Sequence, residues 1–111
     1  MAASVNTSGS QTAVISTQHV LATITAAGTY QLVVDMSAMA GGTTPDELRV
    51  FVFGKARTGD AEVTEEVYHF IGAQSKPLWR SPPVWSPHYY KVAITQTAGT
   101  GRAFPWAVYQ P

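Results

Sequence analysis

The stretch that decides the fold class is residues 47–57, ELRVFVFGKAR, with the turn signal Thr-Gly-Asp at 58–60 and residues 62–72, EVTEEVYHFIG, after it. Both runs are rich in β-branched and aromatic residues, and their side chains alternate between two faces with a period of two. Because a short Gly-containing turn joins them, the pattern predicts a β-hairpin. Both faces of the first run are partly apolar, which predicts a strand covered on both sides.

Short strand-like runs separated by turns continue on both sides of this hairpin. The predicted strands outside it are residues 14–25, 30–34, 89–97 and 102–110. Residues 76–87 contain four prolines, so we expect an edge strand or an extended loop there, and Pro105 indicates an edge or a bulge. Seven or eight short strands without a long amphipathic helix predict an all-β fold, a single antiparallel β-sandwich or jelly-roll-like barrel.

Two features interrupt the strand pattern. An Asp and a Ser precede Ala and Met residues, and two glycines follow, which predicts one short helical turn near residues 36–40. Residues 1–12 are small and polar, a composition typical of an extended arm. We therefore expect two parts: an N-terminal arm at 1–12 and a β-sandwich domain at 13–111.

Composition excludes several function classes. The chain of 111 residues has no cysteine, so disulfides, thiolate metal sites and cysteine nucleophiles are excluded. Seven basic residues balance seven acidic ones, which argues against binding to nucleic acid. There is no secretory signal and no apolar run long enough to span a membrane. The 13 % of charged residues is low against about 25 % in ordinary soluble domains, and such a surface is typical of close contact with other proteins.

No pattern of residues indicates catalysis, a cofactor or a metal. His19, His69 and His88 have none of the spacings of a zinc site. Glu65 and Glu66 point to opposite faces of a strand, so they cannot flank a glycosidic bond together. No nucleophile motif or phosphate-binding loop is present. We expect a protein that is not an enzyme, with no catalytic, cofactor-binding or metal-binding residues.

Aromatic residues are concentrated in the last third of the chain, among them Trp79, Trp85 and Tyr89. Three interpretations remain open at this point. The rings can plug the open ends of the sandwich, form a subunit contact, because aromatic residues are enriched at the cores of interfaces, or stack on a sugar or another ligand.

Three segments resemble small virion structural proteins of tailed bacteriophages. These segments are residues 30–39, YQLVVDMSAM, residues 46–55, DELRVFVFGK, and residues 95–106, TQTAGTGRAFPW. The resemblance covers most of residues 12–110. It implies a β-sandwich component of the capsid, neck, tail or baseplate, and it offers no catalytic residues to carry over.

From these observations we expect a capsid decoration (cement) protein, which binds an assembled shell and stabilises it. Its partners are then the major capsid protein and copies of itself, as a dimer or trimer, without nucleic acid or membrane. It is made in the cytoplasm of the host bacterium and located in the virion. The alternatives are a tail, neck or baseplate component and a carbohydrate-binding module. The candidate interface residues, in the arm and in the aromatic segment, are Val5, Thr7, Gln11, Trp79, Arg80, Trp85 and Tyr89.

Overall fold

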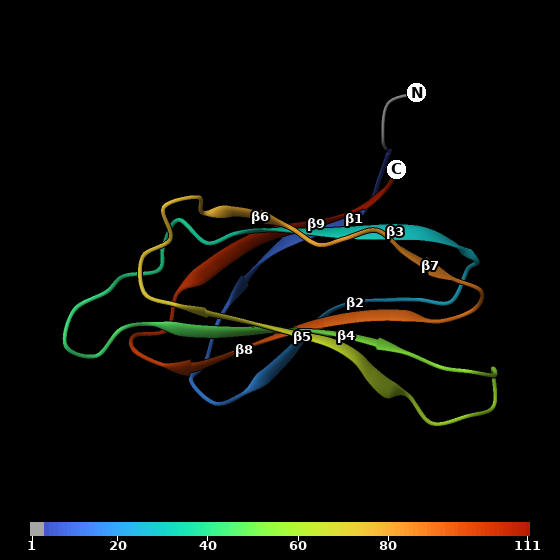
Figure 1. Ribbon diagram of the computed structural model, residues 1–111, viewed down its shortest axis with the longest axis horizontal. Helices are drawn as coiled ribbons and strands as arrows, with labels where there is room; N and C mark the ends of the chain where they lie inside the picture. The colour runs from blue at the N-terminus through green and yellow to red at the C-terminus, as the bar shows by residue number, and fades with distance from the viewer. Residues whose placement is uncertain (1–3) are drawn as a thin grey trace.

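The computed structural model describes residues 4–111, which form nine β-strands in two antiparallel sheets (Figure 1). The strands are β1 (Ser4–Thr12), β2 (Gln18–Ile24), β3 (Gly28–Asp35), β4 (Glu47–Gly54), β5 (Val63–Ile71), β6 (Leu78–Arg80), β7 (Val84–Ser86), β8 (Tyr90–Ala98) and β9 (Ala103–Gln110). The first sheet has the order β1-β9-β3-β6, with β7 also paired to β3, and the second has the order β2-β8-β4-β5. The predicted β-sandwich is confirmed.

The core lies between the two sheets, and the period of two in the sequence places it there. Its fully buried apolar side chains come from alternate positions of β3, β4, β8 and β9: Tyr30, Leu32, Val34, Leu48, Val50, Val52, Tyr90, Val92, Ile94, Phe104 and Val108. The predicted hairpin over residues 47–72 is β4 and β5, which pair from Glu47↔Ile71 to Gly54↔Val63.

The strand count exceeds the predicted seven or eight because the proline-rich segment contains two separate short strands. β6 and β7 have three residues each and pair with opposite ends of β3, on either side of the consecutive residues Pro82 and Pro83. Proline lacks the N–H that a ladder requires, so the chain leaves β3 at that point and returns to it.

The segment expected as an arm is the edge strand of the first sheet. β1 pairs antiparallel with β9 from Ser4↔Gln110 to Thr12↔Ala103, with a bulge at Asn6 (Figure 1). The predicted extended conformation is present, but residues 4–12 belong to the sandwich instead of standing apart from it. Strand pairing uses main-chain groups, so a polar segment needs no apolar side chains to join a sheet. Residues 1–3 of the expected arm lie outside the described residues.

The expected helical turn near residues 36–40 is a reverse turn. The N–H of Met39 donates to the carbonyl of Met36 at 3.1 Å, and both methionine side chains are buried. The next N–H, that of Ala40, donates to the Asp46 carboxylate at 2.8 Å instead of continuing a helix. Because the Asp46 carboxylate accepts the N–H of Ala40, the turn does not continue into a helix.

Pro105 lies in an interior strand, where an edge or a bulge was expected. β9 runs between β1 and β3, but its pairing with β3 ends at Val34↔Trp106. Pro105 itself has only Ser10 of β1 as a cross-strand partner. The proline is tolerated because at its own position β9 has a neighbouring strand on one side only.

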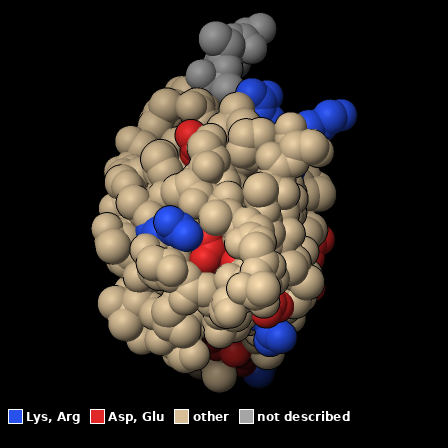
Figure 2. Space-filling view, turned by 90° about the vertical axis from the view of Figure 1, so that its left-hand side faces the viewer, with Lys and Arg blue, Asp and Glu red and all other residues tan. Residues whose placement is uncertain are grey.

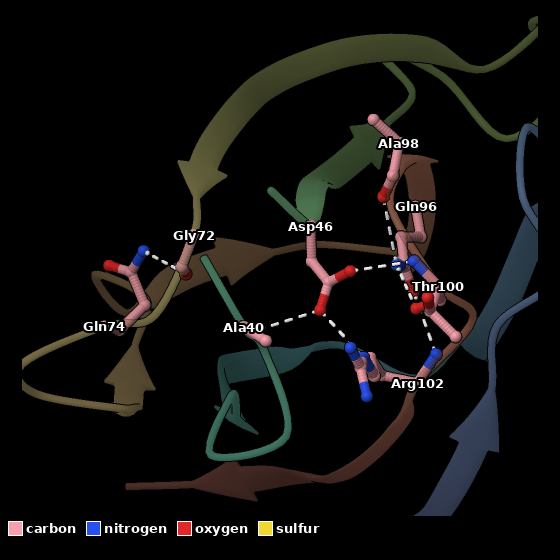
Figure 3. A network of polar contacts seen from close by, with 8 residues as sticks. All are labelled: Ala40, Asp46, Gly72, Gln74, Gln96, Ala98, Thr100 and Arg102. Atoms are coloured by element: carbon pink, nitrogen blue, oxygen red, sulfur yellow. Dashed lines mark hydrogen bonds and ion pairs between the residues drawn. The ribbon is translucent and has the colours of Figure 1, made fainter. Parts of the chain in front are cut away.

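A buried carboxylate ties together the loops at one end of the sandwich (Figure 3). Only 1 % of the surface of Asp46 is exposed. Its carboxylate accepts hydrogen bonds from the N–H groups of Ala40 at 2.8 Å and Thr100 at 2.9 Å, and from Nε of Arg102 at 2.8 Å. The loop before β4 and the turn between β8 and β9 are thereby joined by one side chain.

Gln96 of β8, which is also fully buried, completes this network (Figure 3). Its amide nitrogen donates to the carbonyls of Ala98 and Thr100, and its amide oxygen accepts the N–H of Arg102 at 3.0 Å. Burial by itself raises the pKa of Asp46. The hydrogen bonds from Ala40, Thr100 and Arg102 outweigh it and bring the pKa below the ordinary 3.8.

The two tyrosines of the core, Tyr30 and Tyr90, offer a matched pair of variants. Their rings stack with centroids 5.1 Å apart, and the hydroxyl of Tyr30 donates to the carbonyl of Ala26 at 2.7 Å. The Tyr90 hydroxyl is buried and makes no hydrogen bond of good geometry with the described residues. Burial raises the pKa of Tyr90, and proximity to Ser81 lowers it only in part.

We expect Tyr30→Phe to lower the free energy of unfolding by about 1 kcal/mol, because Ala26 loses its partner. Tyr90→Phe removes a desolvated hydroxyl without a good partner and should be neutral or stabilising. Urea denaturation of both variants beside the wild type measures the difference. An equal loss in the two variants contradicts this account of the core.

Candidate docking surface

The outer face of the first sheet is the most distinctive surface of the molecule. Residues that face each other across neighbouring strands point to the same side of a sheet. The register Val5↔Tyr109↔Gln31 therefore forms one outward row, and Ala107↔Val33↔Arg80 forms the next. Inward-pointing neighbours such as Leu32 and Val108 are fully buried, which agrees with this assignment of faces.

Charge is distributed unequally between the two sheets. Within residues 4–111, the strands of the first sheet carry two charged residues, Asp35 and Arg80. Five such residues occur in the strands of the second sheet: Glu47, Arg49, Glu65, Glu66 and Lys91. Uncharged surface also predominates at the end of the sandwich shown in Figure 2. The outer face of the first sheet is thus poor in charge.

Two adjoining open hollows mark this face. The larger, of about 350 Å³, is lined by Gln31, Val33, Leu78, Arg80 and Tyr109. The second, of about 250 Å³, shares Val33, Leu78 and Tyr109 with it. They lie where β6, β3 and β9 meet, and Leu78 projects there with 52 % of its surface exposed.

Three of the seven candidate interface residues lie on this side of the molecule. Val5 is 54 % exposed, Arg80 is exposed, and Trp85 is the most exposed large hydrophobic residue described, at 68 %. Trp85 is opposite Thr29, next to the inward pair Val84 and Tyr30, so it points outward. We define the docking face as Val5, Gln31, Val33, Leu78, Arg80, Trp85 and Tyr109.

Trp79 faces the interior. It is opposite the buried Val34, and its ring packs against Tyr68 at 4.8 Å and Phe70 at 5.4 Å between centroids. The indole closes the gap between β6 and β5 at the open side of the sandwich. This is the plug interpretation of the aromatic cluster, and it leaves little of Trp79 for a partner.

Two residues of β1 also point inward. Thr7 is opposite the buried Val108, and Gln11 is opposite the buried Phe104. The amide nitrogen of Gln11 lies 3.2 Å from Nδ1 of His19, whose Nε2 accepts the N–H of Val14 at 3.0 Å. These contacts hold the turn between β1 and β2, so Thr7 and Gln11 are left out of the docking face.

Tyr89 belongs to a separate polar cluster beside the start of β8. Its hydroxyl donates to Glu62 at 2.8 Å, and Lys91 Nζ lies 2.9 Å from the same carboxylate. Lys55 Nζ is 4.3 Å from the centre of the Tyr89 ring, which is a cation–π distance. The hydrogen bond from Lys91, then that from Tyr89, lowers the pKa of Glu62. All four groups are satisfied by one another, so the cluster joins the β4–β5 turn to β8.

The candidate interface residues chosen from the sequence did not include Leu78, Tyr109, Gln31 or Val33, which line the hollows. The signal was present in part, because residues 30–34 form a nearly continuous apolar run. Both faces of such a strand are apolar, and only the pairing shows which face is covered. In the proline-rich segment apolar and polar residues do not alternate, so the sequence does not indicate which way the Leu78 side chain points.

Among residues 4–111, no group of three or more His, Asp and Glu side chains could hold a metal ion. No helix in the described part of the chain is long and apolar enough to cross a membrane. Comparison with protein-family models, with curated proteins and with solved structures finds no match to this chain.

Proposed function

We propose that the protein is a non-enzymatic capsid decoration protein of a bacteriophage, which binds the assembled shell through the docking face. The observation that carries this proposal is the charge-poor, hollowed outer face of the first sheet with Leu78 and Trp85 exposed on it. The resemblance of three sequence segments to virion structural proteins supports the same conclusion.

The physical basis is the composition of protein interfaces. Their buried centres are depleted of charged residues and enriched in aromatic residues and arginine. Trp85 and Leu78 are suited to insert into a partner, and Tyr109 and Arg80 can supply hydrogen bonds beside them. Arg80 makes no ion pair with a described residue, so its guanidinium is free for a carboxylate or carbonyl of the partner. When several copies bind one lattice together, contacts that are weak singly can give tight binding.

Copy number tests the location. Quantitative mass spectrometry of particles purified from the virus that encodes the chain should give one copy per major capsid subunit, or a simple lattice fraction of it. A handful of copies per particle overturns decoration in favour of a tail, neck or baseplate component. Absence from particles overturns both.

The docking face itself is tested by a pair of arginine substitutions. Leu78→Arg should lower the affinity for shells that lack the protein by at least about tenfold, because an unpaired charge is then desolvated in the contact. Val67→Arg is the matched control: Val67 lies on the second sheet and is 50 % exposed, against 52 % for Leu78. Unfolding curves should match in both variants. Equal binding of the two variants contradicts this choice of face.

One observation favours a second candidate, a carbohydrate-binding module. Trp85 presents 68 % of its surface, and an exposed indole can stack on a sugar ring. In that case the wild-type protein should bind glycans on an array, and Trp85→Ala should abolish the signal. Absence of binding by the wild type rejects this candidate.

A further inference from the structure

The edge strand β1 is open along one side. It stands at the end of the order β1-β9-β3-β6, and within residues 4–111 it pairs with β9 alone. Its sequence, SVNTSGSQT, contains no charged residue and no proline. After the bulge at Asn6, the pairing from Thr7 to Thr12 is unbroken. A row of free main-chain donors and acceptors along such a strand is a template for another strand.

Two of the other sheet edges carry features that hinder strand addition. β5 carries the adjacent charges Glu65 and Glu66. β6 is three residues long and is bounded by Pro77 and Pro82. Charges, prolines, short length and β-bulges are among the devices by which proteins keep sheet edges from pairing. β1 has nine residues with no charge and no proline, and its one bulge, at Asn6, lies before the unbroken stretch from Thr7 to Thr12.

We propose that β1 pairs antiparallel with β1 of a second copy of this chain, joining the two first sheets across a two-fold axis. A second copy suits this edge because self-pairing places no like charges against each other, whereas self-pairing of β5 would bring glutamates together. Ser and Thr side chains on facing strands can also form hydrogen bonds with each other. An interface between identical strands is isologous and closes as a dimer.

The dimer would enlarge the docking face. A two-fold axis perpendicular to the sheet keeps both outer faces on the same side, so Val5 and Tyr109 of the two copies lie on one continuous surface. The dimer is the form of self-association that we propose for the decoration protein. Whether the chain dimerises can be tested independently of whether it binds a shell. Its test uses the purified chain alone.

The first test is the mass of the protein in solution by analytical ultracentrifugation. The wild type should sediment as a dimer, at twice the 11.9 kDa of the chain. Ser8→Lys together with Ser10→Lys places charges on the exposed side of β1 and should give a monomer. The monomer should still unfold cooperatively, and at a lower urea concentration than the dimer, because it loses the stabilisation by association. Thr64→Lys, on the exposed edge strand β5, is the control and should remain a dimer.

The second test exploits the absence of cysteine from the chain. Single cysteines are introduced at positions 7, 8, 10 and 11 of β1 and, as a control, at Thr64. Under mild oxidation, disulfide-linked dimers should be strongest for the positions nearest the two-fold axis and absent for Thr64→Cys. A monomeric wild type, a dimer that survives the lysine pair, or no crosslink in the whole β1 series overturns the proposal. A monomer would leave a strand of another protein as the partner for this edge.

Discussion

Asp46→Asn is expected to lower the free energy of unfolding by about 3 kcal/mol. The carboxylate accepts two main-chain N–H groups and the Arg102 guanidinium, and it is almost completely buried. An amide in its place retains the volume but turns an NH₂ group toward at least one of these donors. Arg102 has 33 % of its side chain exposed, so water compensates part of the loss at that end. Urea denaturation measures the change.

The pH dependence gives a second readout of the same site. The pKa of Asp46 is lower in the folded protein than its ordinary value of 3.8. Ionised Asp46 therefore contributes its full stability above that value, and the contribution is lost as the pH falls through the lower folded pKa. The wild type should lose stability below about pH 4. Asp46→Asn should be less stable at neutral pH and fall less steeply in this range, so that the two stability curves approach each other at low pH.

Asp60→Asn is the control for this prediction. Asp60 pairs with Arg57 at 3.0 Å, but the Arg57 side chain is 84 % exposed. Exposed ion pairs contribute little to stability, so the loss should be under about 1 kcal/mol. Equal losses at the two aspartates would contradict the central role of the buried carboxylate.

Gly99→Ala should destabilise the protein by about 3 kcal/mol or prevent folding. Gly99 has a φ of +88°, a left-handed conformation that alanine adopts only with strain. A Cβ at this position would lie 2.7 Å from Cα of Asp46, which is main chain and cannot move aside cheaply. The same substitution therefore strains the turn and displaces the buried carboxylate. Thermal and urea unfolding measure the loss.

Gly59→Ala is the matched substitution in the other hairpin turn. A Cβ there meets nothing within 4 Å, and its φ lies outside the left-handed region. The variant should be as stable as the wild type or gain up to about 1 kcal/mol, because alanine restricts the unfolded chain. A loss at position 59 equal to that at 99 would show that loss of glycine flexibility, not contact with Asp46, is responsible.

Much of the fold could be predicted from local pattern. The alternation in residues 47–72 specifies a hairpin, and prolines in 76–87 confine that segment to short strands near an edge. The candidate site was less accessible to prediction. Val5, Arg80 and Trp85 were chosen from composition and lie on the docking face, whereas Trp79, of the same residue type as Trp85, is packed in the interior. Leu78 carried no distinguishing local signal. Tyr109 belongs to the aromatic residues concentrated in the last third of the chain, but that concentration does not show which way its side chain points.

The sequence by itself determined the fold class, the alternating core positions and the absence of thiol chemistry, because these depend on residue type and a period of two. Tertiary structure alone decided which strands are neighbours. That choice made residues 4–12 an edge strand, because their partner, β9, is about a hundred residues away along the chain. It also buried Asp46 at the end of the sandwich, where Ala40, Thr100 and Arg102, which are separated along the chain, converge on its carboxylate.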